Sequence, residues 1–153
     1  MRERIGRYRM AVSDHHPVAE DTVAFMHALA TQVPVGIASG AFREEIVHVL
    51  ELTGLAGLVS VIVSIDEVRD EKPHPESFIT ALAHINRDRP EAFAPEHTVV
   101  IEDATDGARA ARAAGMRCVA IRGSAYEEAT GLAELVVDRL TVMLARVLLG
   151  FEP

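Results

Sequence analysis

The sequence predicts an α/β protein built on a doubly wound, mostly parallel sheet. Short apolar runs rich in β-branched residues alternate along the chain with segments whose apolar residues recur at helical spacing. Strands that alternate with helices in this way pair in parallel and carry helices on both faces of the sheet. Polar residues follow several of the strands, and ligands of such sheets bind at the carboxyl ends of the strands. The sequence therefore predicts one functional edge.

Composition narrows the class of protein. The 153 residues fit one domain with a single substantial core, and 49% of them are hydrophobic. No apolar run approaches the roughly 18 residues of a transmembrane helix, and the first ten residues lack the apolar centre of a signal peptide, so cytoplasmic residence is expected. The lone cysteine, Cys118, cannot form an internal disulfide. A net charge of -8 argues against nucleic acid or an anionic membrane as the main partner.

The first half of the chain predicts two helices and two strands. A helix is expected over residues 19–31, where the apolar residues on one face are Val23, Met26, Leu29 and Ala30. A short strand follows over residues 33–38, with Pro34 near its start, where a missing N–H donor is tolerated. The next helix, residues 42–53, should end at Gly54, and residues 59–65 form the next apolar strand.

The second half continues the alternation. Pro75 suits the first turn of a helix that carries Phe78, Leu82 and Ile85. After a polar connection over residues 86–97, a strand is expected over residues 98–101, followed by a helix of small residues that ends near Gly115. A strand over 116–121, a loop with a short helix over 124–134, a strand over 135–137 and an apolar helix over 139–149 complete the order.

Lys72 is the only lysine among 15 basic residues, and the other 14 are arginines. A planar guanidinium does not reproduce a compact ammonium charge in a tight site, which favours a functional role for this lysine over chance survival on the surface. Pro73 biases Lys72 to an extended backbone, just ahead of the helix that Pro75 opens. The lysine is thus expected on a rigid loop.

Two acids and a serine stand at the ends of other strands. Glu102 and Asp103 follow the strand over residues 98–101, where they could hold a hard cation or, alternatively, only cap the next helix. Ser39, followed by Gly40, ends the strand over residues 33–38 and could be no more than a turn serine. Together with Lys72, a hydroxyl, an ammonium and a Mg²⁺ ion held by two carboxylates would suit a phosphoryl group.

At these residues the chain resembles the haloacid dehalogenase-like (HAD) hydrolases, in particular the β-phosphoglucomutase-like and phosphoglycolate-phosphatase-like subgroup. The resemblance covers about residues 19–138 and rests on three motifs in order: residues 35–40 (VGIASG), residues 66–76 with Lys72-Pro73-His74-Pro75, and residues 100–116. It implies that Ser39, Gly40 and Lys72 bind the transferring phosphoryl group and that Glu102 and Asp103 bind Mg²⁺. It also implies that the substrate is a small phosphate ester.

The sequence departs from this family at its start. Members open with a strand that ends in Asp-x-Asp-Gly, whose first aspartate becomes phosphorylated, and no Asp-x-Asp occurs in this chain. Residues 1–18 instead look like a remnant of the family's cap or linker, and residues 19–153 like a HAD core without its first strand. One alternative makes residues 8–12 a replacement strand with Asp14 as the nucleophile, although no second acid stands two residues on. Without an activated nucleophile, covalent phosphoryl transfer has no first step.

The same departure predicts a gap in the sheet. The missing strand is central in the family, so the strands over residues 33–38 and 98–101 lose their shared neighbour, and open apolar edges must be covered. They are expected to pair directly, to recruit residues 8–12, or to pair with another chain, which makes a homo-oligomer one outcome. Two functions stay open: part of a Mg²⁺-dependent phosphatase or phosphomutase that is inactive alone, or a non-catalytic relative that binds phosphate or a partner.

Overall fold

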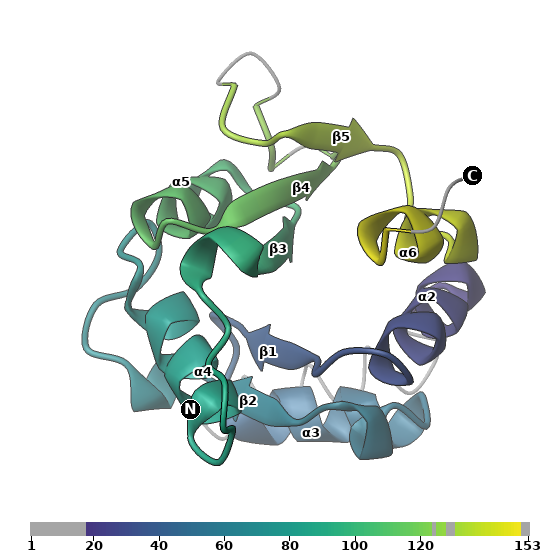
Figure 1. Ribbon diagram of the computed structural model, residues 1–153, viewed down its shortest axis with the longest axis horizontal. Coiled ribbons are helices and arrows are strands. Elements are labelled where there is room, and N and C mark those ends of the chain that lie inside the picture. The colour runs from purple at the N-terminus through teal and green to yellow at the C-terminus, as the bar shows by residue number, and fades with distance from the viewer. Residues whose placement is uncertain (1–17, 124, 128–130, 151–153) are drawn as a thin grey trace.

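The computed structural model describes residues 18–123, 125–127 and 131–150, which form an α/β arrangement (Figure 1). Its helices are α2 (Glu20–Ala30), α3 (Arg43–Leu52), α4 (Glu76–Asn86), α5 (Thr105–Ala113) and α6 (Val142–Leu148). Its strands are β1 (Gly36–Ala38), β2 (Val61–Val63), β3 (Val99–Glu102), β4 (Arg117–Ile121) and β5 (Leu135–Val137). Short 3₁₀ segments lie before β2 (Ala56–Leu58), after β2 (Ile65–Glu67) and before β3 (Pro95–His97). None of the helices in the described ranges is long and apolar enough to cross a bilayer.

The strands form two separate parallel sheets. β1 pairs with β2, with Gly36 opposite Val61, while β3 pairs with β4 and β4 with β5. Figure 1 shows the two sheets on opposite sides of the molecule, with α4 near one end of the interval between them and α2 beside α6 near the other. The parallel α/β class predicted from the sequence is confirmed, but its sheet is divided.

Direct pairing of β1 with β3, one of the three expected ways to cover their edges, does not occur. Side chains from the flanking helices, including Phe25 of α2 and Phe78 of α4, line an apolar cavity of about 570 Å³ together with both strands. The cavity thus lies between the two strand edges. The alternative that recruits residues 8–12 lies outside the described residues, as do Asp14 and most of the expected cap remnant.

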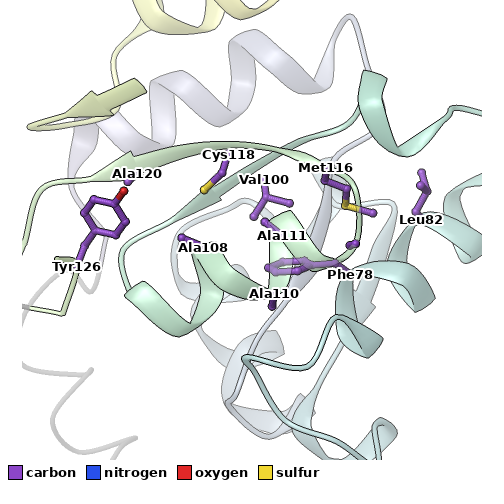
Figure 2. Packing of buried hydrophobic residues seen from close by; sticks show 11 residues of the cluster. Phe78, Leu82, Val100, Ala108, Ala110, Ala111, Met116, Cys118, Ala120 and Tyr126 are labelled. Atoms are coloured by element: carbon purple, nitrogen blue, oxygen red, sulfur yellow. The ribbon is translucent and has the colours of Figure 1, made fainter. Parts of the chain in front are cut away.

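The core packs on both faces of the sheets. Figure 2 shows the larger cluster, in which Val100 and Cys118 of the sheet meet the alanines of α5, Phe78 of α4 and the ring of Tyr126. A second cluster centres on Phe25 of α2, which packs with Val119 and with residues of α6 on the opposite face. α3 covers β1 and β2 through a third cluster: Ile46, Leu50 and Leu55, with Ile37 and Ile62 packed against them.

Small residues let α5 lie close to the sheet. Ala108, Ala110 and Ala111 are completely buried, so the helix backbone approaches β3 and β4 without bulky side chains between them. The chain leaves the helix through Gly115, whose φ of 74° lies in the left-handed region that glycine adopts without strain. Beyond it β4 carries Cys118, and burial raises the pKa of this thiol to about 11, with the negative charge of Glu102 as a lesser cause. Cys118 is therefore a protonated core residue at neutral pH.

The predicted helices agree with the structure to within a few residues, and so do the strands predicted over residues 98–101, 116–121 and 135–137, whereas the first two predicted strands are too long. β1 begins at Gly36 rather than at residue 33, and β2 covers three of the seven residues expected. Apolar side chains continue beyond the backbone pairing, because Val35 and Val59 pack in the core without forming part of a strand. The helical face expected for α2 omitted Phe25, which is the most deeply buried residue of that helix. The short helix expected over residues 124–134 falls partly outside the described residues.

Candidate functional site

Lys72 links the two sheets at their carboxyl ends. Its ammonium nitrogen Nζ donates to the carbonyl oxygen of Ala38, the last residue of β1, over 3.1 Å. It also forms an ion pair of 2.6 Å with Oε2 of Glu102, the last residue of β3. The ring of Phe78 lies beneath the ammonium, with its centroid at 4.6 Å. Lys72 and Glu102, far apart in the sequence, thus meet at the carboxyl ends of β1 and β3.

The backbone around Lys72 accounts for this reach. The Lys72–Pro73 peptide bond is cis, and Pro75 is the N-cap residue of α4. Both carboxylate oxygens of Glu76, in the first turn of α4, accept backbone N–H groups, from Arg69 at 3.1 Å and from Asp70 at 2.9 Å. These two hydrogen bonds fasten the loop to the helix, so the lysine extends from a well-anchored segment.

Ser39 lies beside Lys72 and forms the turn after β1. Its N–H donates to the carbonyl of Val63 in β2 at 3.0 Å, and its Oγ accepts the N–H of Ala41 at 3.1 Å. The turn role considered for this serine is therefore real, but the hydroxyl still has its own proton to donate. Ser39, Gly40 and Lys72 line a small cavity of about 80 Å³.

The Glu102 carboxylate is held in place through both of its oxygen atoms, by Lys72 and by the backbone of Asp103. Besides the pair with Lys72, Oε1 accepts the N–H of Asp103 at 3.2 Å, and only 11% of the Glu102 side chain is exposed. The carboxylate lies over the first turn of α5, where a Cβ added to Gly107 would overlap its carbon and oxygen. Because glycine has no side chain, the Glu102 carboxylate can lie directly against α5 at residue 107. The sequence did not predict this role for Gly107.

Asp103 is exposed, and its carboxylate stands next to that of Glu102 in the chain. Neither acid caps α5 with its side chain: Ala104 is the N-cap residue, and no side-chain hydrogen bond caps this helix. The capping alternative is therefore wrong in its hydrogen-bonded form. Mg²⁺ is commonly held by one or two carboxylates and completes its shell with water and phosphate oxygens, so this donor set fits the ion. A cation there would compete with Lys72 for Glu102.

A second group of metal-binding residue types lies on the loop before α4. Ligand atoms of Asp70, His74 and Glu76 all fall within 4.8 Å of one another, a spacing at which they could hold a metal ion. In this structure the Glu76 carboxylate already accepts two backbone N–H groups, and the His74 Nδ1 accepts the N–H of Glu76 at 3.3 Å. These hydrogen bonds explain why the three side chains lie close together: they anchor the loop that carries Lys72.

Ser77, next to Glu76 in α4, has a buried hydroxyl with no hydrogen-bond partner among the described residues, and it lines the same small cavity as Lys72. An unpaired buried polar group costs stability. We expect Ser77→Ala to raise the free energy of unfolding by about 1 kcal/mol, measured by urea denaturation.

Ser64 provides the matched control for Ser77. It is equally buried, but its Oγ donates to Oε2 of Glu67 at 2.5 Å. Ser64→Ala should therefore lower the free energy of unfolding, by about 1 to 2 kcal/mol. A loss of stability in Ser77→Ala would show that its hydroxyl does have a partner, such as a water molecule in the cavity.

Arg43 and Glu67 fasten the start of α3 to the segment after β2. The guanidinium of Arg43 donates to both carboxylate oxygens of Glu67 and to the carbonyl of Ile62 at 2.8 Å. Hydrogen bonds from Arg43 first, and then from Ser64, lower the pKa of Glu67 from 4.5 to about 2. The pair is half exposed and screened by solvent, so its contribution is below about 1 kcal/mol.

This pKa gives a testable pH dependence. A carboxylate whose pKa is lower in the folded state stabilises the fold above pH 4.5, and that stabilisation is lost as the pH falls towards 2. The difference in urea midpoint between the native chain and Glu67→Gln should shrink over this window. Arg43→Met removes the largest cause of the lowered pKa and should raise the lower end of this window towards pH 4.5, which narrows it. A difference that stays constant from pH 6 to pH 2.5 would contradict the assignment.

Comparison with known proteins identifies the family of this chain. A family model for haloacid dehalogenase-like hydrolases matches residues 4–115, well over half of the sequence. The chain belongs to this family. The HAD match includes most of the 1–18 segment that the sequence reading placed outside the core. The site motifs at Ser39, Lys72 and Glu102 all lie within the matched residues.

Individual HAD relatives agree with the family match. The validoxylamine A 7'-phosphate phosphatase of Streptomyces hygroscopicus subsp. limoneus is 31% identical over 110 residues, covering 72% of this chain and 49% of that protein. The structure of CbbY from Rhodobacter sphaeroides in complex with phosphate superposes with a TM-score of 0.62 at 28% identity, covering 75% of this chain and 50% of the other. A HAD phosphatase from Thermococcus onnurineus matches the fold with a TM-score of 0.72 at 24% identity, over 88% and 59% of the two chains. The chain thus spans about half the length of these HAD proteins.

Proposed function

We propose that this chain forms the phosphate- and Mg²⁺-binding part of a HAD-type phosphohydrolase site and binds small phosphate esters without turning them over on its own. The observation that supports this most is the position of the Lys72 ammonium, which stands between the ends of β1 and β3 and beside Ser39. The curated relative from Streptomyces is named as a phosphatase, and CbbY was solved with phosphate.

Each residue has a part in this proposal. Lys72 neutralises charge on a phosphoryl oxygen, while the Ser39 hydroxyl and the backbone N–H of Gly40 donate hydrogen bonds to the same group. Glu102 and Asp103 would hold Mg²⁺, which supplies further positive charge when bound. The nucleophile is the missing part, because no Asp-x-Asp occurs in the sequence. A phosphate ester would therefore bind and leave unchanged.

Binding of inorganic phosphate tests the site without relying on turnover. We expect titration calorimetry to detect binding to the native chain and a loss of roughly 10- to 100-fold in Lys72→Met, which is the worth of one charge-assisted hydrogen bond. Arg109→Met is the matched control, because Arg109 is an exposed cation paired with Asp106 on α5. Equal phosphate affinity in Lys72→Met and Arg109→Met would exclude Lys72 from the site.

Mg²⁺ should strengthen phosphate binding. In the structure the Lys72 ammonium is paired with the Glu102 carboxylate. A cation held by Glu102 and Asp103 would replace Lys72 in this pair and leave the ammonium free to bind phosphate. The Asp103→Asn variant should lose this Mg²⁺ effect while keeping phosphate binding in the absence of the metal. Phosphate affinity that does not respond to Mg²⁺ would remove the metal from the proposal.

The proposal also predicts no hydrolysis of 4-nitrophenyl phosphate by this chain alone. Mg²⁺-dependent turnover that is abolished by Lys72→Met and by Asp14→Asn would contradict the inactive assignment. It would instead identify Asp14 as the nucleophile, as in the alternative based on residues 8–12.

A further inference from the structure

Ser77 has two polar groups that the fold does not use. Only 6% of the residue is exposed, and its Oγ makes no hydrogen bond within the described part of the chain. Its backbone N–H lies in the first turn of α4, where N–H groups have no acceptor within the helix, and it finds none elsewhere among the described residues. A buried polar group without a partner costs stability, so the hydroxyl needs an explanation outside the fold itself.

The position of Ser77 supplies that explanation. The residue lines the cavity of about 80 Å³ that Ser39, Gly40 and Lys72 also line. At roughly 30 Å³ for each water molecule, this volume holds about two or three waters. It is therefore on the scale of a phosphoryl group and too small for a whole phosphate ester. The unpaired hydroxyl thus belongs to the residues around the proposed phosphate site.

The groups around this cavity offer more donors than acceptors. Lys72 uses two of the three N–H donors of its ammonium within the protein, and the Ser39 hydroxyl keeps a proton to donate. The N–H of Gly40 makes no hydrogen bond in the part of the chain that the structure describes. Glu71 is the one acid among the described lining residues, and it is exposed to water. An anion rich in acceptors would satisfy several of these donors together.

We propose that Ser77 is a further phosphate-binding residue, whose hydroxyl donates a hydrogen bond to an oxygen of the phosphoryl group held by Lys72. This inference rests on the proposed phosphate site. In the structure the Ser77 Oγ has almost no solvent-exposed surface, so the contact requires rotation of the side chain to another of its three staggered positions. No hydrogen bond holds the hydroxyl where it is, so the rotation breaks none. The positive end of the α4 dipole also favours an anion here.

The proposal predicts opposite effects of one substitution on stability and on binding. Ser77→Ala should raise the urea midpoint, as argued above, and should weaken the binding of inorganic phosphate to the full chain by roughly 10-fold in titration calorimetry. Thr80→Val is the matched control, because it removes a hydroxyl from the same helix at a residue that is not among the described residues lining the cavity. Its phosphate affinity should equal that of the native chain. Native affinity in Ser77→Ala, or an equal loss in Thr80→Val, would overturn the proposal.

Ser77→Cys separates the hydrogen bond from the shape of the cavity. A thiol occupies the place of the hydroxyl but is a weak donor, so this variant should lose phosphate affinity about as much as Ser77→Ala. Native affinity in Ser77→Cys would show that filling the space is enough, and the proposal would fail. If Ser77→Ala does not fold, Ser77→Cys decides.

The Lys72→Met background separates direct contact from positioning of the lysine. If the Ser77 hydroxyl contacts phosphate itself, Ser77→Ala should weaken binding by a similar factor in this background, as measured by NMR titration with inorganic phosphate. No further loss would mean that Ser77 acts only through Lys72, which overturns the proposal. Failure of the phosphate site as a whole gives a different result, because the native chain would then bind no phosphate. A native chain that binds phosphate through Lys72 but does not respond to Ser77→Ala would remove Ser77 alone.

Discussion

Lys72→Met is expected to destabilise the fold by about 2 kcal/mol, between the small worth of an exposed ion pair and the 3–5 kcal/mol lost when a fully buried pair is broken. The side chains of Lys72 and Glu102 are 21% and 11% exposed, so neither charge is well hydrated. Methionine keeps the contact with the Phe78 ring but leaves the Glu102 carboxylate without its cation. Urea denaturation at neutral pH measures the loss.

The matched double variant separates the ion pair from its surroundings. Lys72→Met combined with Glu102→Gln removes both charges, and its free energy of unfolding should return to within about 1 kcal/mol of the native value. The control is Arg109→Met with Asp106→Asn, an exposed pair on α5, whose variants should each change stability by less than about 0.5 kcal/mol. Additive losses in the Lys72 and Glu102 cycle would contradict direct coupling between them.

Gly107→Ala is expected to cost about 2 kcal/mol or more, although alanine is the better helix former by about 1 kcal/mol. A Cβ at this position overlaps the Glu102 carboxylate, so the side chain must leave its place over α5 and give up its contact with Lys72. The substitution therefore acts on the site through a residue that touches no ligand. Denaturation and phosphate titration of the same variant measure both effects.

The effect of this substitution should change sign when Glu102 is truncated. In a Glu102→Ala background the overlapping carboxylate is gone, and Gly107→Ala should then raise the free energy of unfolding by about 1 kcal/mol. Ordinary crowding against the rest of the core would make the substitution unfavourable in both backgrounds. That outcome would show that Gly107 is required by the sheet rather than by Glu102.

The sequence predicted the order of elements well because helices and strands differ in the period of their apolar residues. It also predicted that Lys72 and the Glu102 segment would meet, because strand ends of a parallel sheet share an edge. Their chemical roles remain a prediction. Strand lengths were overestimated at residues 33–35, since apolarity reports burial and not hydrogen bonding.

Other features depend on side-chain geometry that no sequence pattern carries. Gly107 stands in the first turn of a helix, where glycine is unfavourable by about 1 kcal/mol, and this was the one available hint that something lies against it. Nothing in the sequence distinguishes the unpaired hydroxyl of Ser77 from the paired one of Ser64. The sequence predicted that β1 and β3 would lack a shared neighbour, but it did not predict that the sheet divides in two with an apolar cavity between the parts.

The rate at which the thiol of Cys118 is chemically modified reports how often the sheet of β3, β4 and β5 opens. The thiol is buried in β4, between β3 and β5, and its raised pKa keeps it unreactive while that sheet is closed. A thiol reagent can therefore modify the native protein only during excursions that expose β4, and the modification rate counts those excursions. A ligand confined to the small cavity near Ser39 should leave that modification rate nearly unchanged, because no residue of β4 lines this cavity.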